Sequence, residues 1–285
     1  MLELWLTEKI GVSLPIKYTD ETADAMENLP MAAGNPMVDP MHFDRWAGAY
    51  ERFRPPYPGA LWERLRDLGL MLPGRRAVEL GAGSGQATAA LVEAGLSVTA
   101  VEPGPNLAGR LRARLPEVTV LAGTAEEAEL PEAGFDLAVA ATSVHWLNLE
   151  IVLPKLHRTL VPGSSFAVWR TAFGDPAVRT RFRERTGQIV GRRRAASARP
   201  GPGELDTAGW VRELTAGGLF AEVSTDTFRW SIVLGADEVH GLFSTFSNWS
   251  AAEVEEATQA VRDLGGSVTE HYVTPLIVLE RAASP

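Results

Sequence analysis

Short apolar segments alternate with helix-like segments along the middle of the chain. The predicted strands are 77–80, 97–101, 118–122, 135–141 and 166–170, and the helices between them are 87–94, 106–115 and 149–160. Strands that alternate with helices imply parallel strands joined by right-handed crossovers. Apolar runs, instead of strict apolar–polar alternation, are typical of a sheet that is covered on both faces. We therefore expect a doubly wound α/β fold, which binds ligands at the carboxyl ends of its central strands.

The regular alternation of strands and helices does not extend to the two ends of the chain. Upstream, the spacing predicts helices over 43–52 and 60–68, separated by Pro55, Pro56 and Pro58. Downstream, the predicted order is an arginine-rich helical segment at 175–198, a Pro/Gly linker at 198–203, a helix at 210–215, a strand at 220–232, a helical stretch at 236–264 and a final strand at 272–279.

These patterns suggest a two-part organisation of the chain. Residues 1–40 are interpreted as an N-terminal extension, either a tail or an arm that serves as a lid or dimer contact. Residues 41–285 form one domain, in which segments of about 172–205 and 236–265 are inserted as a helical cap. The oligomeric state, monomer or homodimer, is left open.

Composition narrows the classes of function. The 285 residues include no cysteine, which excludes disulfides, thiolate metal sites and a cysteine nucleophile. A formal charge of −9 without a basic tail argues against binding a nucleic-acid backbone. No apolar run is long enough to span a membrane, and the first residues lack the order of a signal peptide. We expect a cytoplasmic protein, and no histidine–carboxylate cluster predicts a metal site.

The strongest motif is a glycine loop directly after the first predicted strand, Ala77-Val-Glu-Leu-Gly-Ala-Gly-Ser-Gly-Gln86. Such glycines permit a tight turn and let the backbone approach a ligand closely. A dinucleotide site would require a third glycine where Gln86 stands, because Gly85 comes one residue early. A triphosphate loop would require Gly-Lys-Ser/Thr, which is absent.

Two acidic residues indicate what the loop binds. Glu79 lies at the carboxyl end of the first strand, where it would repel a diphosphate but attract an ammonium group. S-adenosylmethionine carries an ammonium and a sulfonium and has no phosphate, so Glu79 favours this cofactor over NAD. Glu102 ends the second strand, about twenty residues past the loop, where an acid can accept hydrogen bonds from both ribose hydroxyls. Pro103 follows it and can pack against the adenine.

The sequence resembles the class I methyltransferases that act on small molecules, and in particular a bacterial group related to the trans-aconitate methyltransferases. The resemblance runs from about Phe43 to Arg281. The matching segments are Phe43-Asp-Arg-Trp-Ala-Gly-Ala-Tyr50, Arg54-Pro-Pro-Tyr-Pro58, Glu79-Leu-Gly-Ala-Gly-Ser-Gly-Gln86, Val101-Glu-Pro103, Phe135-Asp-Leu-Ala-Val-Ala-Ala141, His145-Trp-Leu147, Leu160-Val-Pro-Gly163, Gly265-Gly-Ser-Val268 and Tyr272-Val-Thr274.

The resemblance implies a Rossmann-like sheet of seven strands, with the last strand antiparallel and beside the sixth, and an N-terminal helical lid. It also implies S-adenosylmethionine as cofactor and S-adenosylhomocysteine as product. Many relatives carry an aspartate where this chain has Thr124, whose hydroxyl can still accept from the adenine amine. The implied cofactor-binding residues are Tyr50, Arg54 (near the cofactor carboxylate), Glu79, Gly81, Ala82, Gly83, Gly85, Gln86, Glu102, Pro103, Thr124, Ala125, Glu126, Ala140 and Ala141.

His145 is the candidate general base. It lies just past the fourth strand, at the cofactor end of the sheet, and its ordinary pKa suits proton removal at neutral pH. The alternative is that His145 and Trp146 form a packed aromatic turn that shapes the pocket, because methyl transfer needs a base only when the acceptor arrives protonated. His42, His157, His240 and His271 are weaker candidates.

The cap offers two groups of candidate acceptor contacts. Phe243, Phe246 and Trp249, together with Trp146, are predicted to line a substrate pocket; the alternative for some of these rings is a place in the core. The arginines between Arg179 and Arg199 could form a rim that binds an acidic acceptor, or simply a solvated helix face.

The sequence therefore predicts an S-adenosylmethionine-dependent methyltransferase with a small-molecule acceptor, for which secondary metabolism is one candidate setting. It does not distinguish oxygen, nitrogen or carbon methylation. The alternatives are a cyclase or decarboxylase on the same scaffold, an NAD-dependent oxidoreductase, which Glu79 and Gln86 oppose, and a non-catalytic binding protein.

Overall fold

The computed structural model describes residues 42–193 and 202–283, all within one compact unit, Val38–Pro285. The predicted extension 1–40 lies outside the described residues. So do most of the predicted linker and the end of the first cap segment, at 194–201.

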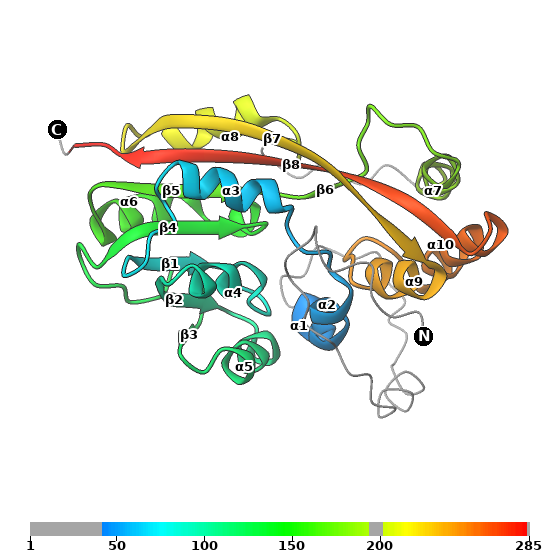
Figure 1. The fold of residues 1–285 in the computed structure, drawn as a ribbon, viewed down its shortest axis with the longest axis horizontal. Coiled ribbons are helices and arrows are strands. Elements are labelled where there is room, and N and C mark those ends of the chain that lie inside the picture. Colours follow the sequence, from blue (N-terminus) through cyan, green and yellow to red (C-terminus); the bar gives the residue numbers. More distant parts are fainter. Residues whose placement is uncertain (1–41, 194–201, 284–285) are drawn as a thin grey trace, which may run out of the picture. The chain divides into compact units, whose positions relative to one another are not determined.

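Eight strands form a single sheet in the order β3-β2-β1-β4-β5-β8-β6, and β7 pairs with β8 (Figure 1). The strands are β1 (Arg76–Leu80), β2 (Ser97–Glu102), β3 (Thr119–Ala122), β4 (Phe135–Ala141), β5 (Leu160–Trp169), β6 (Ala172–Phe173), β7 (Phe220–Gly235) and β8 (Ser267–Arg281). Neighbours from β3 to β5 are parallel, whereas β8 is antiparallel to β5, β6 and β7. The predicted doubly wound sheet with an antiparallel last strand is confirmed, and the two-residue β6 is an additional strand.

Helices pack on both faces of this sheet. They are α1 (His42–Arg45), α2 (Ala47–Phe53), α3 (Gly59–Asp67), α4 (Gln86–Glu93), α5 (Pro105–Arg114), the 3-10 turn η1 (Val144–Trp146), α6 (Leu149–Thr159), α7 (Arg181–Gly191), α8 (Thr207–Thr215), α9 (Ala236–Ser244) and α10 (Ala251–Asp263). One core joins α3 and α4 to side chains of β1, β4 and β5, and a second joins α6 and α8 to the alternate side chains of the same strands. Burial on both faces explains why these strands read as continuous apolar runs.

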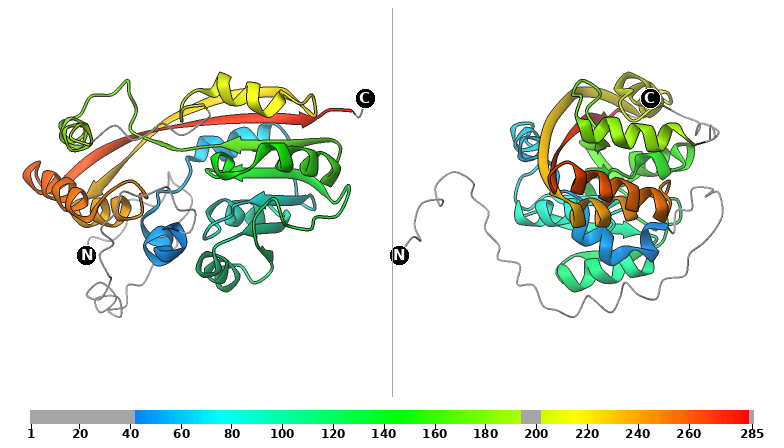
Figure 2. Two further views of the ribbon diagram at one scale, coloured as in Figure 1. Left: turned by 180° about the vertical axis from the view of Figure 1, so that it is seen from behind. Right: turned by 90° about the vertical axis from the view of Figure 1, so that its right-hand side faces the viewer.

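A third core lies at the far end of the long β7–β8 ribbon. The ribbon extends past β5, and α9, α10 and α7 pack around its end (Figures 1 and 2). Buried side chains of these three helices form this core together with Leu234 of β7 and Val268 of β8. We call this part, with β6, the cap.

Three predicted helices differ from the structure in their bounds. The helix expected at 43–52 is two helices, α1 and α2, which meet at Trp46. The arginine-rich helix begins only at Arg181, because the Thr180 side chain accepts a hydrogen bond from the Arg183 amide (3.1 Å) and so caps the first turn. The stretch at 236–264 is divided into α9 and α10, and Ser250 and Glu253 form a capping box at the second start.

Candidate functional site

The glycine loop follows β1 and leads into α4 at the carboxyl edge of the sheet. Gly81 and Gly85 have φ of +69° and +87°, which side chains rarely adopt. A Cβ at Gly85 would lie 2.1 Å from Leu111 Cδ1, and one at Gly81 would lie 2.7 Å from Ser143 Cβ. Because neither position has space for a side chain, the glycines keep the backbone in its turn and close to its neighbours.

Glu102, at the end of β2, binds the loop directly. Its carboxylate accepts hydrogen bonds from the backbone amides of Gly83 (2.7 Å) and Gly104 (2.8 Å). Burial raises the pKa of Glu102, and these two bonds oppose that rise because they stabilise the ionised form. Each carboxylate oxygen has lone pairs left for a further donor, so the residue can hold the loop and still accept from ribose hydroxyls.

Glu79 is 1% exposed and accepts a hydrogen bond from the Thr88 hydroxyl of α4, at 2.6 Å. Burial raises its pKa to about 8, although the bond from Thr88 acts in the opposite direction. At neutral pH the carboxyl group therefore holds its proton for most of the time. An ammonium group placed beside it would lower this pKa again and draw out the proton.

The N-terminal helices cover the loop. Tyr50 and Tyr57 line a cavity of about 10 Å³ together with Glu79, Gly81, Ala82, Ser84, Gln86, Ala87 and Ala141. The Gln86 side chain donates to the backbone carbonyl of Arg54 (2.9 Å), which connects the lid to the start of α4. We call this space the cofactor cavity.

Arg54 follows α2 and lies among aromatic rings. Its guanidinium carbon is 4.9 Å from the Tyr50 ring, 5.3 Å from Phe173 and 4.8 Å from Phe246. Its hydrogen bonds go to the cap, because Nε donates to the Thr245 hydroxyl (3.0 Å) and Nη2 to the Thr245 carbonyl (3.1 Å). The expected contact of Arg54 with a cofactor carboxylate stays a prediction. The contact of Arg54 with Thr245, which joins the lid to the cap, was not predicted.

The segment expected to face adenine follows β3. The Thr124 hydroxyl interacts with the side chain of Glu127 (3.2 Å), and Glu126 accepts from the Asn148 amide (2.7 Å). Ala125 is buried, and Pro103 is exposed beyond β2. These residues lie where the carboxyl ends of β2 and β3 meet, and their contact with adenine stays a prediction.

The end of β4 brings further groups to the cofactor cavity. Ala140 and Ala141 are buried at its last two positions. Thr142 follows with φ of +59°, which is unusual for a residue with a side chain, and its hydroxyl is 3.2 Å from the Tyr57 hydroxyl. This turn directs the Ser143 hydroxyl to the Leu80 carbonyl (2.6 Å), so β4 and the glycine loop are held together.

His145 and Trp146 lie in η1, directly after that turn. Their rings are 5.1 Å apart, and the Trp146 ring meets Phe43 of α1 edge-on at 5.7 Å. The arrangement fits an aromatic turn below the lid. It is also compatible with a base near the cofactor, so the role of His145 stays a prediction.

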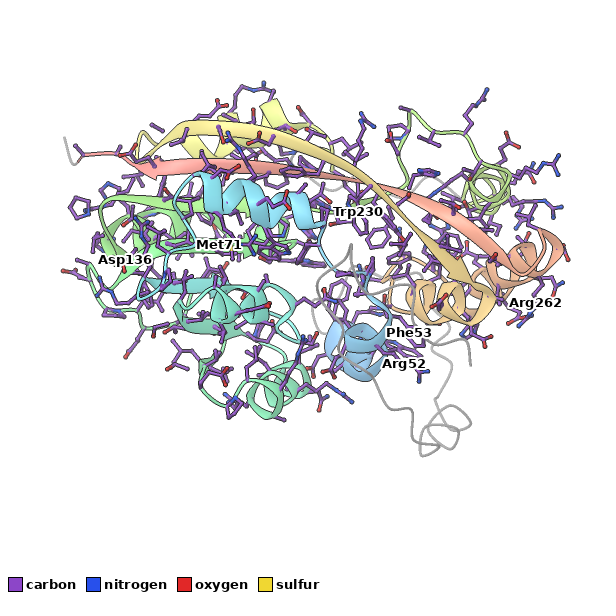
Figure 3. The ribbon with its side chains drawn as sticks, viewed as in Figure 1. Arg52, Phe53, Met71, Asp136, Trp230 and Arg262 are labelled. Atoms are coloured by element: carbon purple, nitrogen blue, oxygen red, sulfur yellow. The ribbon has the colours of Figure 1, made fainter. Side chains whose placement is uncertain are left out.

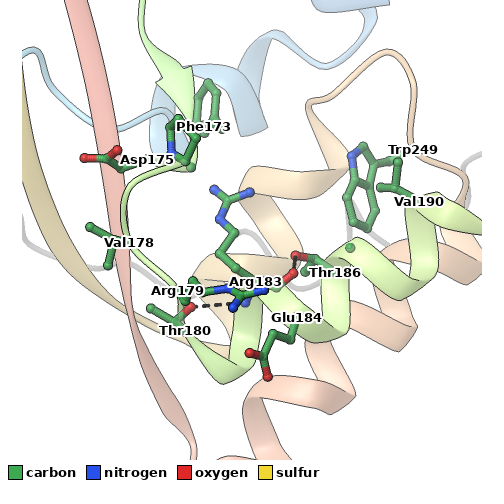
Figure 4. Close-up of a pocket in the computed structure, with 13 residues that line it drawn as sticks. Phe173, Asp175, Val178, Arg179, Thr180, Arg183, Glu184, Thr186, Val190 and Trp249 are labelled. Atoms are coloured by element: carbon green, nitrogen blue, oxygen red, sulfur yellow. Dashed lines mark hydrogen bonds between the residues drawn. The ribbon is translucent and has the colours of Figure 1, made fainter.

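The cap residues expected to line an acceptor pocket occupy different places. Phe243 is 2% exposed within the cap core, and Phe246 lies against Arg54. Trp249 borders a separate cavity of about 430 Å³, between α7 and the segment that follows β6 (Figure 4). We call this space the cap cavity. An acceptor role for these three rings stays a prediction.

Four of the six rim arginines that the structure describes pair with acids, three of them with acids of α10. Arg193 bonds Glu253 (2.7 Å), Arg192 pairs with Glu256, and Arg185 is 3.8 Å from Asp263. Arg183 bonds the buried Glu270 of β8 (2.7 Å). These pairs attach α7 to the rest of the cap, while Arg194 and Arg199 lie outside the described residues.

A family model for a methyltransferase domain matches residues 78–168, from β1 to β5. Over 153 residues the chain is 39% identical to an uncharacterized methyltransferase from Mycobacterium bovis, which covers 53% of this chain and 60% of that one. A solved structure of a putative type II methyltransferase from Anaeromyxobacter dehalogenans is 27% identical, with a TM-score of 0.58, and the match covers 80% of this chain and 97% of that one. These similarities support the predicted class I S-adenosylmethionine-dependent methyltransferase.

A further solved structure supports the fold, without selecting a subgroup. Phosphoethanolamine N-methyltransferase 2 from Haemonchus contortus, solved with S-adenosylhomocysteine, has the same fold, with a TM-score of 0.51 at 16% identity over 87% of this chain and 61% of that one. This chain spans about 60% of the length of the curated relatives it matches first. The relation to the trans-aconitate methyltransferases stays a prediction.

The methyltransferase site contains residues that the sequence did not reveal as candidates. Thr88 binds Glu79, and Tyr57 lines the cofactor cavity. Asp44 of α1 accepts from the backbone amides of Asn106 (2.8 Å) and Leu107 (2.9 Å), which attaches the lid to the start of α5. Thr88 could have been predicted, because it lies on the face of α4 that meets β1. The contact of Asp44 could not, because it joins residues about sixty positions apart.

Among the residues that the structure describes, no cluster of histidine and acidic residues is arranged to hold a metal. None of the described helices has the length and apolar character needed to cross a membrane.

Proposed function

We propose that this methyltransferase transfers the methyl group of S-adenosylmethionine to a small-molecule acceptor, with secondary metabolism as one candidate setting. The observation that carries the proposal is the pair of buried acids around the glycine loop, Glu79 and Glu102. Glu102 accepts a hydrogen bond from the Gly83 amide. In this proposal Glu102 also binds the ribose, and Glu79 binds the ammonium group.

Methyl transfer requires few catalytic groups from the protein. When bound, the cofactor supplies a methyl group already activated by its sulfonium, so the chain has to bind both reactants, align them and exclude water. Tyr50 and Tyr57 cover the loop and exclude solvent from Glu79. In this proposal His145 accepts a proton from the acceptor when the acceptor arrives protonated.

The geometry favours methyl transfer over an NAD-dependent oxidoreductase. An ammonium group beside Glu79 stabilises the ionised form of this buried acid, whereas a diphosphate at the loop would bring a second negative charge beside it. A cyclase or decarboxylase on the same scaffold would keep the cofactor, so only the product distinguishes it from a methyltransferase.

Calorimetry on the full chain tests the cofactor assignment. S-adenosylhomocysteine should saturate a single site, and NAD should give no saturation. The reverse result would overturn the proposal. A screen of small acceptors with labelled S-adenosylmethionine then tests methyl transfer, because a product heavier by one methyl group excludes the cyclase and decarboxylase alternatives.

The same screen tests His145. Once an acceptor is found, His145→Ala should lower kcat about 100-fold or more and remove the acidic limb of the pH–rate profile, if the residue is a base. Unchanged kcat in a folded variant would assign His145 to the aromatic turn.

A further inference from the structure

The cap cavity is a separate space with its own lining. Its volume of about 430 Å³ lies within the range of small-molecule sites. Its apolar wall consists of Phe173, Val178, Val190 and Trp249, contributed by β6, the segment after it, α7 and the α9–α10 connection. None of its lining residues lines the cofactor cavity.

Arg183 places a guanidinium group in this cavity. Figure 4 shows the side chain extending from α7 toward Phe173, and Gly174 leaves room for it, since a Cβ there would lie 2.6 Å from Arg183 Cζ. Only Nε is used in the bond to Glu270. Nη2 is buried without a hydrogen-bond partner among the described residues, as is Oε2 of Glu270. Two donors of this guanidinium thus remain for a ligand.

Arg179 adds a second positive charge. It lines the cavity, is exposed, and forms no ion pair with any residue in the described ranges. Two acids also line the cavity. Asp175 is paired with Arg229, and Glu184 directs its carboxylate away from the guanidinium of Arg183 (Figure 4). Neither of these two acids therefore pairs with Arg183 or Arg179.

The two cavities are connected through Arg54. Its guanidinium contacts Phe173, which lines the cap cavity, and Tyr50, which lines the cofactor cavity. Tyr272 packs against Phe173, and its buried hydroxyl has no hydrogen-bond partner among the described residues. Burial and Glu270 raise the pKa of Tyr272, whereas Arg183 and Arg54 lower it.

We propose that the cap cavity binds the anionic end of the methyl acceptor, an organic molecule that carries a carboxylate on an aromatic or aliphatic body. Arg183 and Arg179 attract the carboxylate, and Phe173, Val190 and Trp249 contact the body. Because Phe173 and Arg54 lie between the two cavities, a carboxylate held in the cap cavity is an anchor and is not the group that receives the methyl. The proposal rests on the proposed methyl transfer.

A weak-binding probe tests the site without a known acceptor. The full chain, saturated with S-adenosylhomocysteine, is titrated with 4-fluorophenylacetate and with the neutral 4-fluorophenylacetamide, and binding is followed by fluorine NMR. The variants are Arg179→Gln and, as matched control, Arg181→Gln, which removes the same charge two residues away at an exposed position outside the cavity lining.

The acid should bind the wild-type protein at least about fivefold more tightly than the amide, and Arg179→Gln should weaken it about fivefold. Arg181→Gln should leave it unchanged. No binding of the acid, equal binding of the amide, or an equal loss in both variants would overturn the proposal. Absence of S-adenosylhomocysteine binding in the same samples would overturn the proposed function, and the response to the acid would still report on the cap cavity.

Discussion

The cofactor cavity and the cap cavity are built by different means. At the cofactor cavity the backbone is fixed by three glycines with positive φ and by hydrogen bonds from loop amides to Glu102. At the cap cavity the walls are side chains from four segments, attached to one another by ion pairs such as Arg183–Glu270. The turn of the first cavity and the acids around it lie within residues 79–102, although Tyr50, Tyr57 and Ala141 complete its lining. The lining of the second comes entirely from side chains spread between Phe173 and Trp249.

The two kinds of construction suit two kinds of ligand, a shared cofactor and an individual acceptor. A backbone-built site tolerates few changes, which suits a cofactor shared by a whole class. A side-chain-built site can change its charge and shape by single substitutions while the scaffold persists, which suits an acceptor particular to one enzyme.

Arg183→Gln should lower the stability of the protein more than any other variant considered. It leaves the 1%-exposed Glu270 without its cation, so we expect the free energy of unfolding to fall by about 3 kcal/mol, measured by urea denaturation. Arg185→Gln is the control, because its ion pair with Asp263 is about half exposed on both sides, and it should cost less than about 0.5 kcal/mol. Equal losses would mean that Glu270 does not depend on Arg183. Cofactor affinity should change in neither variant.

Gly85→Ala should lower the free energy of unfolding by about 2 to 3 kcal/mol, since the new Cβ would lie at a residue with φ of +87° and 2.1 Å from Leu111. Thermal unfolding and calorimetry with S-adenosylhomocysteine should show lower stability and lost binding together. Gly109→Ala, in the exposed part of α5 with nothing within 4 Å, should instead stabilise the protein slightly. A stable, binding-competent Gly85→Ala protein would contradict the backbone-built description.

Glu102→Ala should weaken S-adenosylhomocysteine binding by about 2 kcal/mol, because the loop amides and the ribose lose a charged acceptor together. Calorimetry measures the change. Unaltered affinity would show that the ribose is held elsewhere, and Glu117→Ala at an exposed position provides the control for loss of an acidic group.

The smallest effect is a pH dependence from Glu79. Since its pKa is about 8 in the folded protein, the ammonium group of the ligand must displace its proton below that pH. Affinity for S-adenosylhomocysteine should therefore rise by up to about tenfold per pH unit toward pH 8, with proton release detectable by calorimetry in buffers of different ionisation enthalpy. Glu79→Gln should abolish the proton release. Binding without proton release in the wild-type protein would contradict this assignment.

The same group affects stability with a defined sign. The unfolded chain releases the Glu79 proton near its ordinary pKa of 4.5, and the folded protein keeps it to about 8. Within this window the folded state binds more protons, so the contribution of Glu79 to the free energy of unfolding decreases as the pH rises.

The sheet could be predicted from the sequence because its local signals agree with its tertiary structure. The apolar runs at β1 and β4 are buried on both faces, and the glycine loop lies where its pattern predicted. Glu79 and the glycines favoured the cofactor, since a ligand's charge constrains residues that are adjacent in sequence, and the class followed from the resemblance of longer segments.

The cap could be predicted only in outline. Its helices were indicated by their composition, but the pairing of Arg183 with Glu270 joins residues 87 positions apart and has no local signature. The interpretation of 179–199 as a rim or a solvated face treated all arginines alike, whereas the structure distinguishes Arg183 and Arg179 at the cavity from Arg192, which pairs with Glu256 of α10. Which of two arginines faces inward depends on packing against other elements.

The position of β8 has a consequence for how the protein is made. This strand follows all the others in the chain, yet it lies between β5 and β7 and contributes to all three cores. While the ribosome is still translating β8, β7 lacks the strand with which it pairs, and the apolar side chains that β8 will cover remain accessible to chaperones or to other nascent chains. Assembly of the cap therefore awaits the synthesis of β8.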